Sequence, residues 1–291
     1  QRSEEFYGLL NSKLESISPD AAMAQAVANS PQTLLGYINY FDRKLVVGLT
    51  QDDITANIKR IEPSTISQIY EETQIEVGGQ LIDQFSQLED ADIASYHVGR
   101  EIVSIQAPLE QIAKETSHFG FFNAIPDPDG PLRQAPLFFR HKDRLYPSLA
   151  LKSVSMYFDY DIHPLAGQLF DNTIGGVEFG GDSPVPTDEQ GVQLINYYKD
   201  PANYFPTFSI ADIIDGTVAP SAYEGKIIMV GATALGLFDL RPNPFSPSTP
   251  GVYIHAMSAQ NMIDGLFLQR FQGIGLWESI GYLLLGLLFG L

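Results

Sequence analysis

Apolar residues recur at helical spacing in several stretches of the chain, separated by runs rich in strand-forming residues. Ser18 and Pro19 have the features of a helix N-cap and first turn, and the apolar spacing that follows predicts a helix that Pro31 ends. The same periodicity, together with Gly216 and Gly265 as stop signals, predicts four further helices. They cover residues 108–117, 148–157, 208–214 and 251–265.

Short runs of β-branched and aromatic residues alternate with these helices and predict strands. The run Ile227–Val230 is continuously apolar and bounded by Gly231, as expected for a strand buried on both faces of a parallel sheet. The alternation predicts an α/β fold with a largely parallel or mixed sheet and helices on both faces. The other predicted strands cover residues 33–41, 102–105, 119–124, 132–140 and 192–197.

Residues 50–100 break this alternation because they are polar, acidic and helix-prone, with Gly78 and Gly79 dividing them. We interpret the segment as an insertion or a partner surface within a single domain of residues 1–272.

The end of the chain is strongly apolar. Gly273–Leu291 carries one charge, Glu278, and apolar residues cover every face of the helix it would form. A buried core helix can also be this apolar. We expect the start of a transmembrane helix at 273–291, following the α/β domain. No signal peptide follows Gln1, so we expect a piece of a longer protein.

The charge balance narrows the possible partners. A net charge of −18, from 17 basic and 35 acidic residues, argues against nucleic-acid binding and against lying flat on anionic lipid. The chain has no cysteine, which excludes disulfides and thiolate metal sites. We expect no cofactor and no metal.

Asp127, Asp129 and Gly130 resemble the first half of a calcium loop, in which alternate carboxylates converge on a cation. The Glu that such a loop needs six residues after the glycine is replaced by Pro136. We therefore predict a structural turn, in which Asp129 holds Arg133 by a charge-assisted hydrogen bond.

The segment from Gly231 to Gly236 follows the predicted strand 227–230, and backbone N–H groups of such a turn can hold an anion. It lacks the Gly-Lys-Ser/Thr of a P-loop and the glycine pattern of a dinucleotide fold. The glycines can instead serve only a tight turn. Because ligands of α/β sheets bind at this edge, Thr233 and Asp239 are the best candidates for ligand contacts.

His255 lies one turn into the last predicted helix and is either a structural residue or a link between Asp239 and the exit helix. Asn196 and Tyr197 complete the candidate ligand-binding set, although core packing is the commoner role of such a tyrosine. No catalytic set emerges, because the chain contains no Gly-x-Ser-x-Gly nucleophile motif and too many carboxylates to select an acid–base pair.

Four blocks, in this order and spacing, resemble the second type of CHASE domain, the sensory extracellular module of bacterial cyclases and histidine kinases. The segment 19–41 also resembles the family's earlier helix–strand unit, whereas the opening strand and helix of the family are not found. The blocks are residues 119–151, 192–216, 225–246 and 250–270.

The resemblance implies a non-enzymatic sensor on the periplasmic or extracellular side of a bacterial membrane. It would regulate a cytoplasmic output, most simply an adenylate cyclase making cAMP, or otherwise a guanylate cyclase, a serine/threonine kinase or a histidine kinase. We expect a homodimer that responds to an unidentified small-molecule or protein ligand. A ligand-free dimerisation scaffold and an extracytoplasmic hydrolase are the competing hypotheses.

Overall fold

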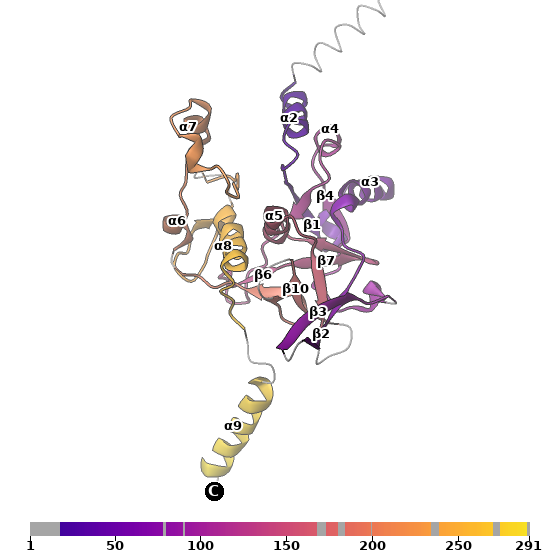
Figure 1. Ribbon diagram of the computed structural model, residues 1–291, viewed down its shortest axis with the longest axis vertical. Helices are drawn as coiled ribbons and strands as arrows, with labels where there is room; N and C mark the ends of the chain where they lie inside the picture. The colour runs from indigo at the N-terminus through magenta and orange to yellow at the C-terminus, as the bar shows by residue number, and fades with distance from the viewer. Residues whose placement is uncertain are drawn as a thin grey trace, which may run out of the picture.

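The computed structural model describes residues 18–77, 80–89, 91–167, 173–179, 184–198, 200–233, 239–269 and 274–289. Its strands form a central body, with helices α2 and α4 side by side at one end and α6, α7 and α8 along one side (Figure 1). The helices are α2 Pro19–Ala28, α3 Gln51–Ile61, α4 Glu110–Ala113, α5 Leu149–Phe158, α6 Pro201–Tyr204, α7 Ile210–Ile214, α8 Gly251–Asp264 and α9 Ile274–Phe289.

A three-stranded sheet has the order β4-β1-β5. Its central strand β1 (Leu35–Tyr40) pairs antiparallel with β4 (Ser104–Gln106) and parallel with β5 (Phe119–Phe121). One face of this sheet buries Tyr37 and Phe121 in a core cluster with Ile61 of α3. The sheet therefore joins the start of the chain to segments more than sixty residues away.

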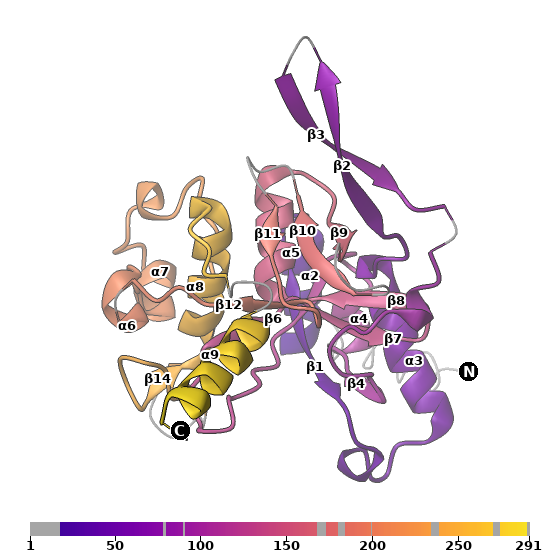
Figure 2. The same cartoon turned by 90° about the horizontal axis from the view of Figure 1, so that it is seen from below.

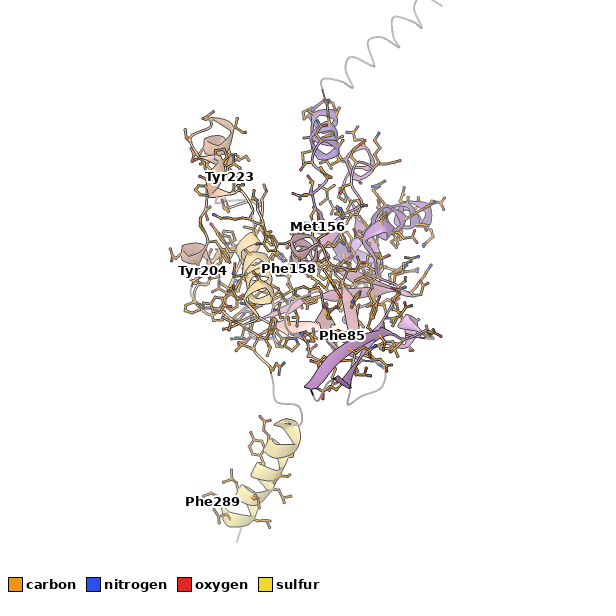
Figure 3. The ribbon with its side chains drawn as sticks, in the orientation of Figure 1. Phe85, Met156, Phe158, Tyr204, Tyr223 and Phe289 are labelled. Carbon is orange, nitrogen blue, oxygen red and sulfur yellow. The ribbon has the colours of Figure 1, made fainter. Side chains whose placement is uncertain are left out.

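A five-stranded sheet has the order β11-β10-β9-β2-β3. Strands β2 and β3 form a ribbon that extends beyond the body, and Phe85 lies on this ribbon (Figures 2 and 3). The strands are β2 Tyr70–Val77, β3 Gln80–Gln87, β9 His163–Ala166, β10 Ile174–Glu178 and β11 Val185–Pro186. Three strand pairs complete the fold: β6 Gln134–Pro136 with β12 Val192–Leu194, β7 Phe138–His141 with β8 Arg144–Pro147, and β13 Leu240–Arg241 with β14 Thr249–Pro250.

Several helices, among them α2 and α5, begin where a side chain satisfies one of the first N–H groups. The Ser18 hydroxyl accepts a hydrogen bond from the Ala21 N–H at 3.0 Å, as the N-cap prediction requires. The Ser148 hydroxyl accepts the Leu151 N–H at the start of α5 in the same way. At the other end of the chain, Gly265 closes α8 in the left-handed conformation, which confirms the predicted stop.

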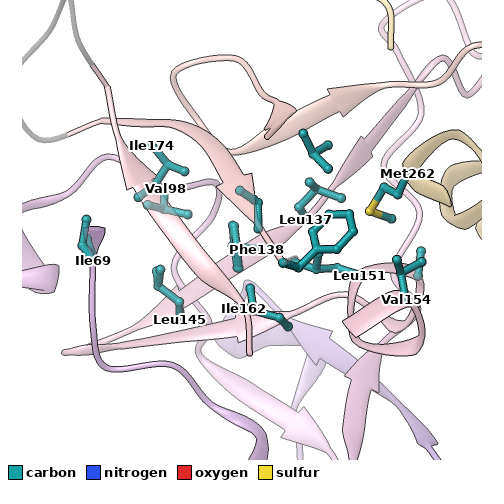
Figure 4. Packing of buried hydrophobic residues seen from close by; sticks show 14 of the residues in the cluster. Ile69, Val98, Leu137, Phe138, Leu145, Leu151, Val154, Ile162, Ile174 and Met262 are labelled. Carbon is teal, nitrogen blue, oxygen red and sulfur yellow. The ribbon is translucent and has the colours of Figure 1, made fainter. Parts of the chain in front are cut away.

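The largest core cluster lies between α5, α8 and the strands (Figure 4). Leu151 and Val154 of α5 and Met262 of α8 are buried in it beside Leu137 and Phe138. Burying side chains of this size stabilises a fold by about 1.5–3 kcal/mol each. The cluster fixes α8 against α5, which matters below because α8 carries candidate site residues.

The α/β prediction and the mixed sheets are confirmed, but a largely parallel sheet is wrong. Two strand pairs in the described residues are parallel, β1 with β5 and β2 with β9, and the others are antiparallel. The strand predicted at Ile227–Val230 is also wrong. Ile227 and Met229 pack against the largest cluster, whereas Ile228 and Val230 are exposed, so only one face of this segment is covered.

The helix-prone interpretation of residues 50–100 is correct for α3 and wrong for the β2–β3 ribbon. Gly78 and Gly79, which were expected to divide the segment, lie outside the described residues. The ribbon was missed because β2 and β3 are polar, so they lack the apolar alternation that reports a half-buried strand.

The apolar end of the chain forms α9, a helix of 16 residues. Over the described part of the chain, no helix combines the length and the apolar character needed to cross a membrane. The predicted membrane span at 273–291 is therefore not found in this structure.

Candidate functional site

The N-terminus of α8 brings together residues that are distant in the sequence. The Gly251 N–H donates to the Asp239 carbonyl oxygen at 2.9 Å. A Cβ on Gly251 would lie 2.7 Å from both carboxylate oxygens of Asp239, so only glycine lets this carboxylate pack against the first turn. A carboxylate at this position is stabilised by the N-terminal end of the helix dipole.

The first residues of the segment predicted as an anion-binding turn lie beside the same first turn of α8. A Cβ on Gly231 would lie 2.5 Å from the Cβ of Val252, so the Gly231 backbone closely approaches the Val252 side chain. Thr233 is exposed, and Gly236 lies outside the described residues. Gly231 and Asp239 therefore both lie beside the N-terminus of α8, and their role in ligand binding stays a prediction.

His255 lies one turn further along α8 and is largely buried. The Phe122 backbone and the charged groups of Asp239 and Arg241 are near enough to influence its ring. Burial lowers the pKa of His255, the Phe122 backbone and the Asp239 carboxylate oppose this, and Arg241 adds to the lowering. The ring is therefore neutral at ordinary pH.

Asp239 is paired with Arg241 rather than hydrogen-bonded to His255. The Arg241 Nε lies 3.4 Å from the Asp239 Oδ1, and both side chains are 44% exposed. The predicted link from Asp239 to His255 is therefore electrostatic proximity within one cluster at the start of α8.

A cavity lies under this part of α8, lined on the helix by Ile254, His255 and Ser258. Its volume is about 20 Å³, which is room for one water molecule. Polar side chains reach it from the opposite elements, namely Asn123, Gln134 and Ser148. The Ser258 hydroxyl donates to the buried Gln193 Oε1 at 2.7 Å.

Sequence reasoning missed these cavity residues, apart from His255. Ser258 could have been found, because it follows His255 by three positions and shares its helix face. Asn123, Gln134 and Gln193 carry no local signal, since only the tertiary fold brings them to α8. A larger hollow of about 430 Å³ lies open to solvent between α2 and α4 and contains none of the predicted residues.

Asn196 lies beside Asn261 near the C-terminal end of α8, whereas Tyr197 packs against the cluster of Leu132, Ile254 and Met257. The Asn196 N–H donates to Asn261 Oδ1 at 2.8 Å, and Asn261 Nδ2 donates back to the Asn196 carbonyl oxygen at 3.0 Å. The Tyr197 hydroxyl donates to the Leu132 carbonyl oxygen at 2.8 Å, and burial raises the pKa of Tyr197. The polar groups of both residues are therefore used in structural hydrogen bonds.

The acidic turn forms around an arginine. Arg133 donates from Nη1 to Asp127 at 2.9 Å. Its Nη1 and Nη2 also donate to the two carboxylate oxygens of Asp129, each at 2.8 Å. Gly130 closes the turn, its N–H donating to the Asp127 carbonyl oxygen at 2.8 Å. The expected bond between Asp129 and Arg133 is present, and within the described ranges no three acidic or histidine side chains gather to hold a metal ion.

With this geometry in place, comparison with known protein families matches residues 2–291 to the CHASE2 domain. The chain belongs to the CHASE2 family. Neither the curated proteins nor the solved structures contain a match to it. CHASE2 domains act as extracytoplasmic sensors in signalling proteins, so the chain is a sensory domain of this kind.

The candidate residues form two groups along α8. In this CHASE2 domain, the residues that the sequence selected as ligand contacts divide into a polar cluster at the start of α8 and a structural tie near its end. Both lie on the last helix before α9.

Proposed function

We propose that this CHASE2 domain is the input unit of a membrane-bound bacterial signalling protein, and that α8 carries its response toward α9. The observation that supports this is the position of the site. His255 and Ser258 line the buried cavity and belong to α8. This helix ends at Asp264, and nine residues lie between it and the start of α9 at Ile274. A ligand, or a change in dimer packing, acts by favouring one of two positions of α8.

The membrane part of the proposal is supported by the surface of α9. Leu283, Leu284 and Leu285 are 65%, 59% and 51% exposed, and as consecutive residues they point about 100° apart around the helix. An apolar helix that is exposed all round needs an apolar environment. We therefore propose that α9 attaches the domain to a membrane by placing its apolar surface among the lipid tails.

Vesicle flotation tests this attachment. The chain is expected to float with phosphatidylcholine vesicles, and the double variant Leu284→Arg, Leu288→Arg is expected to stay at the bottom of the gradient. The matched control Leu45→Arg, Val47→Arg changes two equally exposed apolar residues in the loop after β1. Equal flotation of all three proteins, or of none, would show that α9 does not attach the domain.

The proposed output is an adenylate cyclase that makes cAMP and works as a homodimer. Guanylate cyclase, serine/threonine kinase and histidine kinase outputs fit the same input domain. In the intact signalling protein, Asp239→Asn is expected to change the basal output by several-fold, because it removes the negative charge beside the N-terminus of α8. Asp264→Asn, at the exposed end of the same helix, is the control and should leave the output unchanged.

The small cavity favours a second candidate function. A volume of about 20 Å³ is far below the 300–1,000 Å³ of usual ligand sites, which suits a scaffold that fixes dimer geometry without a ligand. Deleting residues 18–269 from the intact protein separates the two. A sensor loses its response but keeps its assembly through other domains, whereas a scaffold loses the assembly itself, and an unchanged output with unchanged assembly would refute both.

A further inference from the structure

The β2–β3 ribbon is a long, regular element that is poorly covered by the body. Its eight residue pairs run without a register shift from Tyr70–Gln87 to Val77–Gln80. It joins the rest of the five-stranded sheet through one residue pair, Tyr70 with Leu165 of β9. Figure 2 shows the ribbon reaching past the other elements of the body.

The ribbon is anchored only at its base. Ile69 is fully buried in the largest core cluster, and its carbonyl oxygen accepts the Leu88 N–H at 2.9 Å. Beyond this base Glu71, Thr73 and Gln84 are exposed. An isolated two-stranded ribbon is at best marginally stable in water, so an eight-residue extension implies something that stabilises it.

The outer edge of β3 lacks the features that protect natural sheet edges. β3 is the last strand in the sheet order, and in the described part of the chain no strand pairs with its outer side. It has no proline and no bulge, and its one charged residue is Asp83. Free edge strands normally carry charge, proline or a bulge because they otherwise recruit another strand.

Charge distinguishes the two edges of the ribbon. β2 contains three glutamates, Glu71, Glu72 and Glu76, so its edge would repel another acidic chain. β3 is nearly neutral within a chain of net charge −18. A second copy of this chain therefore meets the least repulsion at the edge of β3.

We propose that the edge of β3 is a dimer interface, at which β3 of a second copy adds in antiparallel orientation. The inference rests on the proposed function in that it supplies the homodimer from which the signal is delivered. A two-fold axis at Phe85 places Phe85 opposite its own copy and Asp83 opposite Gln87. The two Asp83 carboxylates are then four residues apart along the pair, whereas an axis at Gln84 would make them diagonal neighbours.

Cysteine cross-linking tests this interface cleanly because the chain contains no cysteine. Facing residues of an antiparallel pair have Cα atoms about 4.5–5.5 Å apart, within the range of a disulfide, so Phe85→Cys should give a cross-linked dimer under mild oxidation. Thr73→Cys is the matched control on the same ribbon. In the proposed dimer the two residues at position 73 would lie three strand spacings apart, about 14 Å, and should not cross-link. The full chain is used in dilute detergent, so that α9 does not drive association.

An isosteric charge change provides the second measurement. Gln84→Glu adds a carboxylate diagonal to its own copy at the interface and should raise the dimer dissociation constant by about fivefold or more. Gln111→Glu, an exposed position on α4, makes the same chemical change away from the ribbon and should leave the constant unchanged.

Two results would overturn the inference. If the chain is a dimer but Phe85→Cys cross-links no better than Thr73→Cys, the copies meet at another surface, and the proposed sensory function is untouched. If the chain is monomeric under all conditions, the interface is excluded, while the flotation and Asp239→Asn experiments still decide the proposed function.

Discussion

The imidazole of His163 stacks on the phenol ring of Tyr70, with ring centroids 4.0 Å apart and planes inclined by 30°. The His163 ring also makes a polar contact, because its Nδ1 lies 2.9 Å from the Oε2 of the buried Glu178. Tyr70 is the first residue of β2, and His163 is the first residue of β9. The stack therefore holds the ribbon to the body beside the pair of Tyr70 and Leu165, which joins β2 with β9 in the described residues.

Replacing Tyr70 by Ala should loosen the ribbon. The change removes an aromatic contact worth about 0.5–1.5 kcal/mol together with buried surface, so the free energy of unfolding should fall by about 1–2 kcal/mol. Amide hydrogen exchange should quicken in β2 and β3 before it changes elsewhere. Tyr70→Phe keeps the ring and should behave like the parent protein. Equal exchange in the alanine variant would mean that the stack does not hold the ribbon.

The buried His255 should make the domain less stable in mild acid. Because burial lowers the pKa of His255 in the folded state, the unfolded chain binds a proton in mild acid more readily than the folded protein does. Its stabilising contribution is complete above the ordinary histidine pKa of about 6.5 and is lost as the pH falls below that value. His118, whose pKa is lowered by burial and by Lys152, acts with the same sign.

Urea unfolding at pH 7.5 and at pH 5.5 measures this effect. His255→Gln should be less sensitive to the pH change than the parent protein, with His118 accounting for part of the remaining sensitivity. His97→Gln, at an exposed histidine, is the matched control and should keep the full sensitivity. An unaltered pH dependence in His255→Gln would contradict the assignment of a buried neutral ring.

Asn261 should be the most sensitive polar residue of α8. Its side chain is fully buried and satisfies both the N–H and the carbonyl oxygen of Asn196. Asn261→Ala leaves these groups without partners and should lower the free energy of unfolding by about 2–3 kcal/mol. The neighbouring Gln260→Ala, whose side chain bonds only to the exposed Asp264, should change it by less than about 0.5 kcal/mol in the same denaturant titration.

The turn around Arg133 should be visible in a titration. The hydrogen bond from Arg133 is the main cause that lowers the pKa of Asp129. This carboxylate therefore stabilises the fold above its unfolded pKa, and the contribution is lost on acidification. Arg133→Leu should move the Asp129 pKa up toward its ordinary value, as followed by carboxyl NMR shifts. An unchanged titration of Asp129 would show that the bond does not persist in solution.

Local signals in the sequence were sufficient for elements whose ends are chemically marked. Ser18, Ser148 and Gly265 fixed helix ends because caps act through neighbouring backbone groups. Ile227–Val230 misled because a continuous apolar run does not say whether both faces find a covering layer, and here one face stays exposed. The polar β2–β3 ribbon was missed because its strands are paired by backbone hydrogen bonds, and its side chains show no apolar alternation.

The candidate site was predictable only in part. Gly231, Asp239 and His255 lie at one helix end, although the strand predicted before Gly231 is not formed. Asn196 and Tyr197 looked equally suitable in sequence, yet their groups are used by Asn261 and by the Leu132 carbonyl oxygen. Which polar residues have free groups depends on partners more than sixty positions away, and no local pattern reports them.

The tie between Asn196 and Asn261 gives α8 the mechanics of an unequal lever. If Asn261 is the fulcrum, the arm toward Gly251 is about 15 Å long and the arm toward Asp264 is about 4.5 Å, at 1.5 Å per residue. A displacement at the Gly251 end is then reduced about threefold at the Asp264 end, while the force is multiplied by the same factor. The C-terminal end of α8 is therefore expected to make small displacements with a larger force.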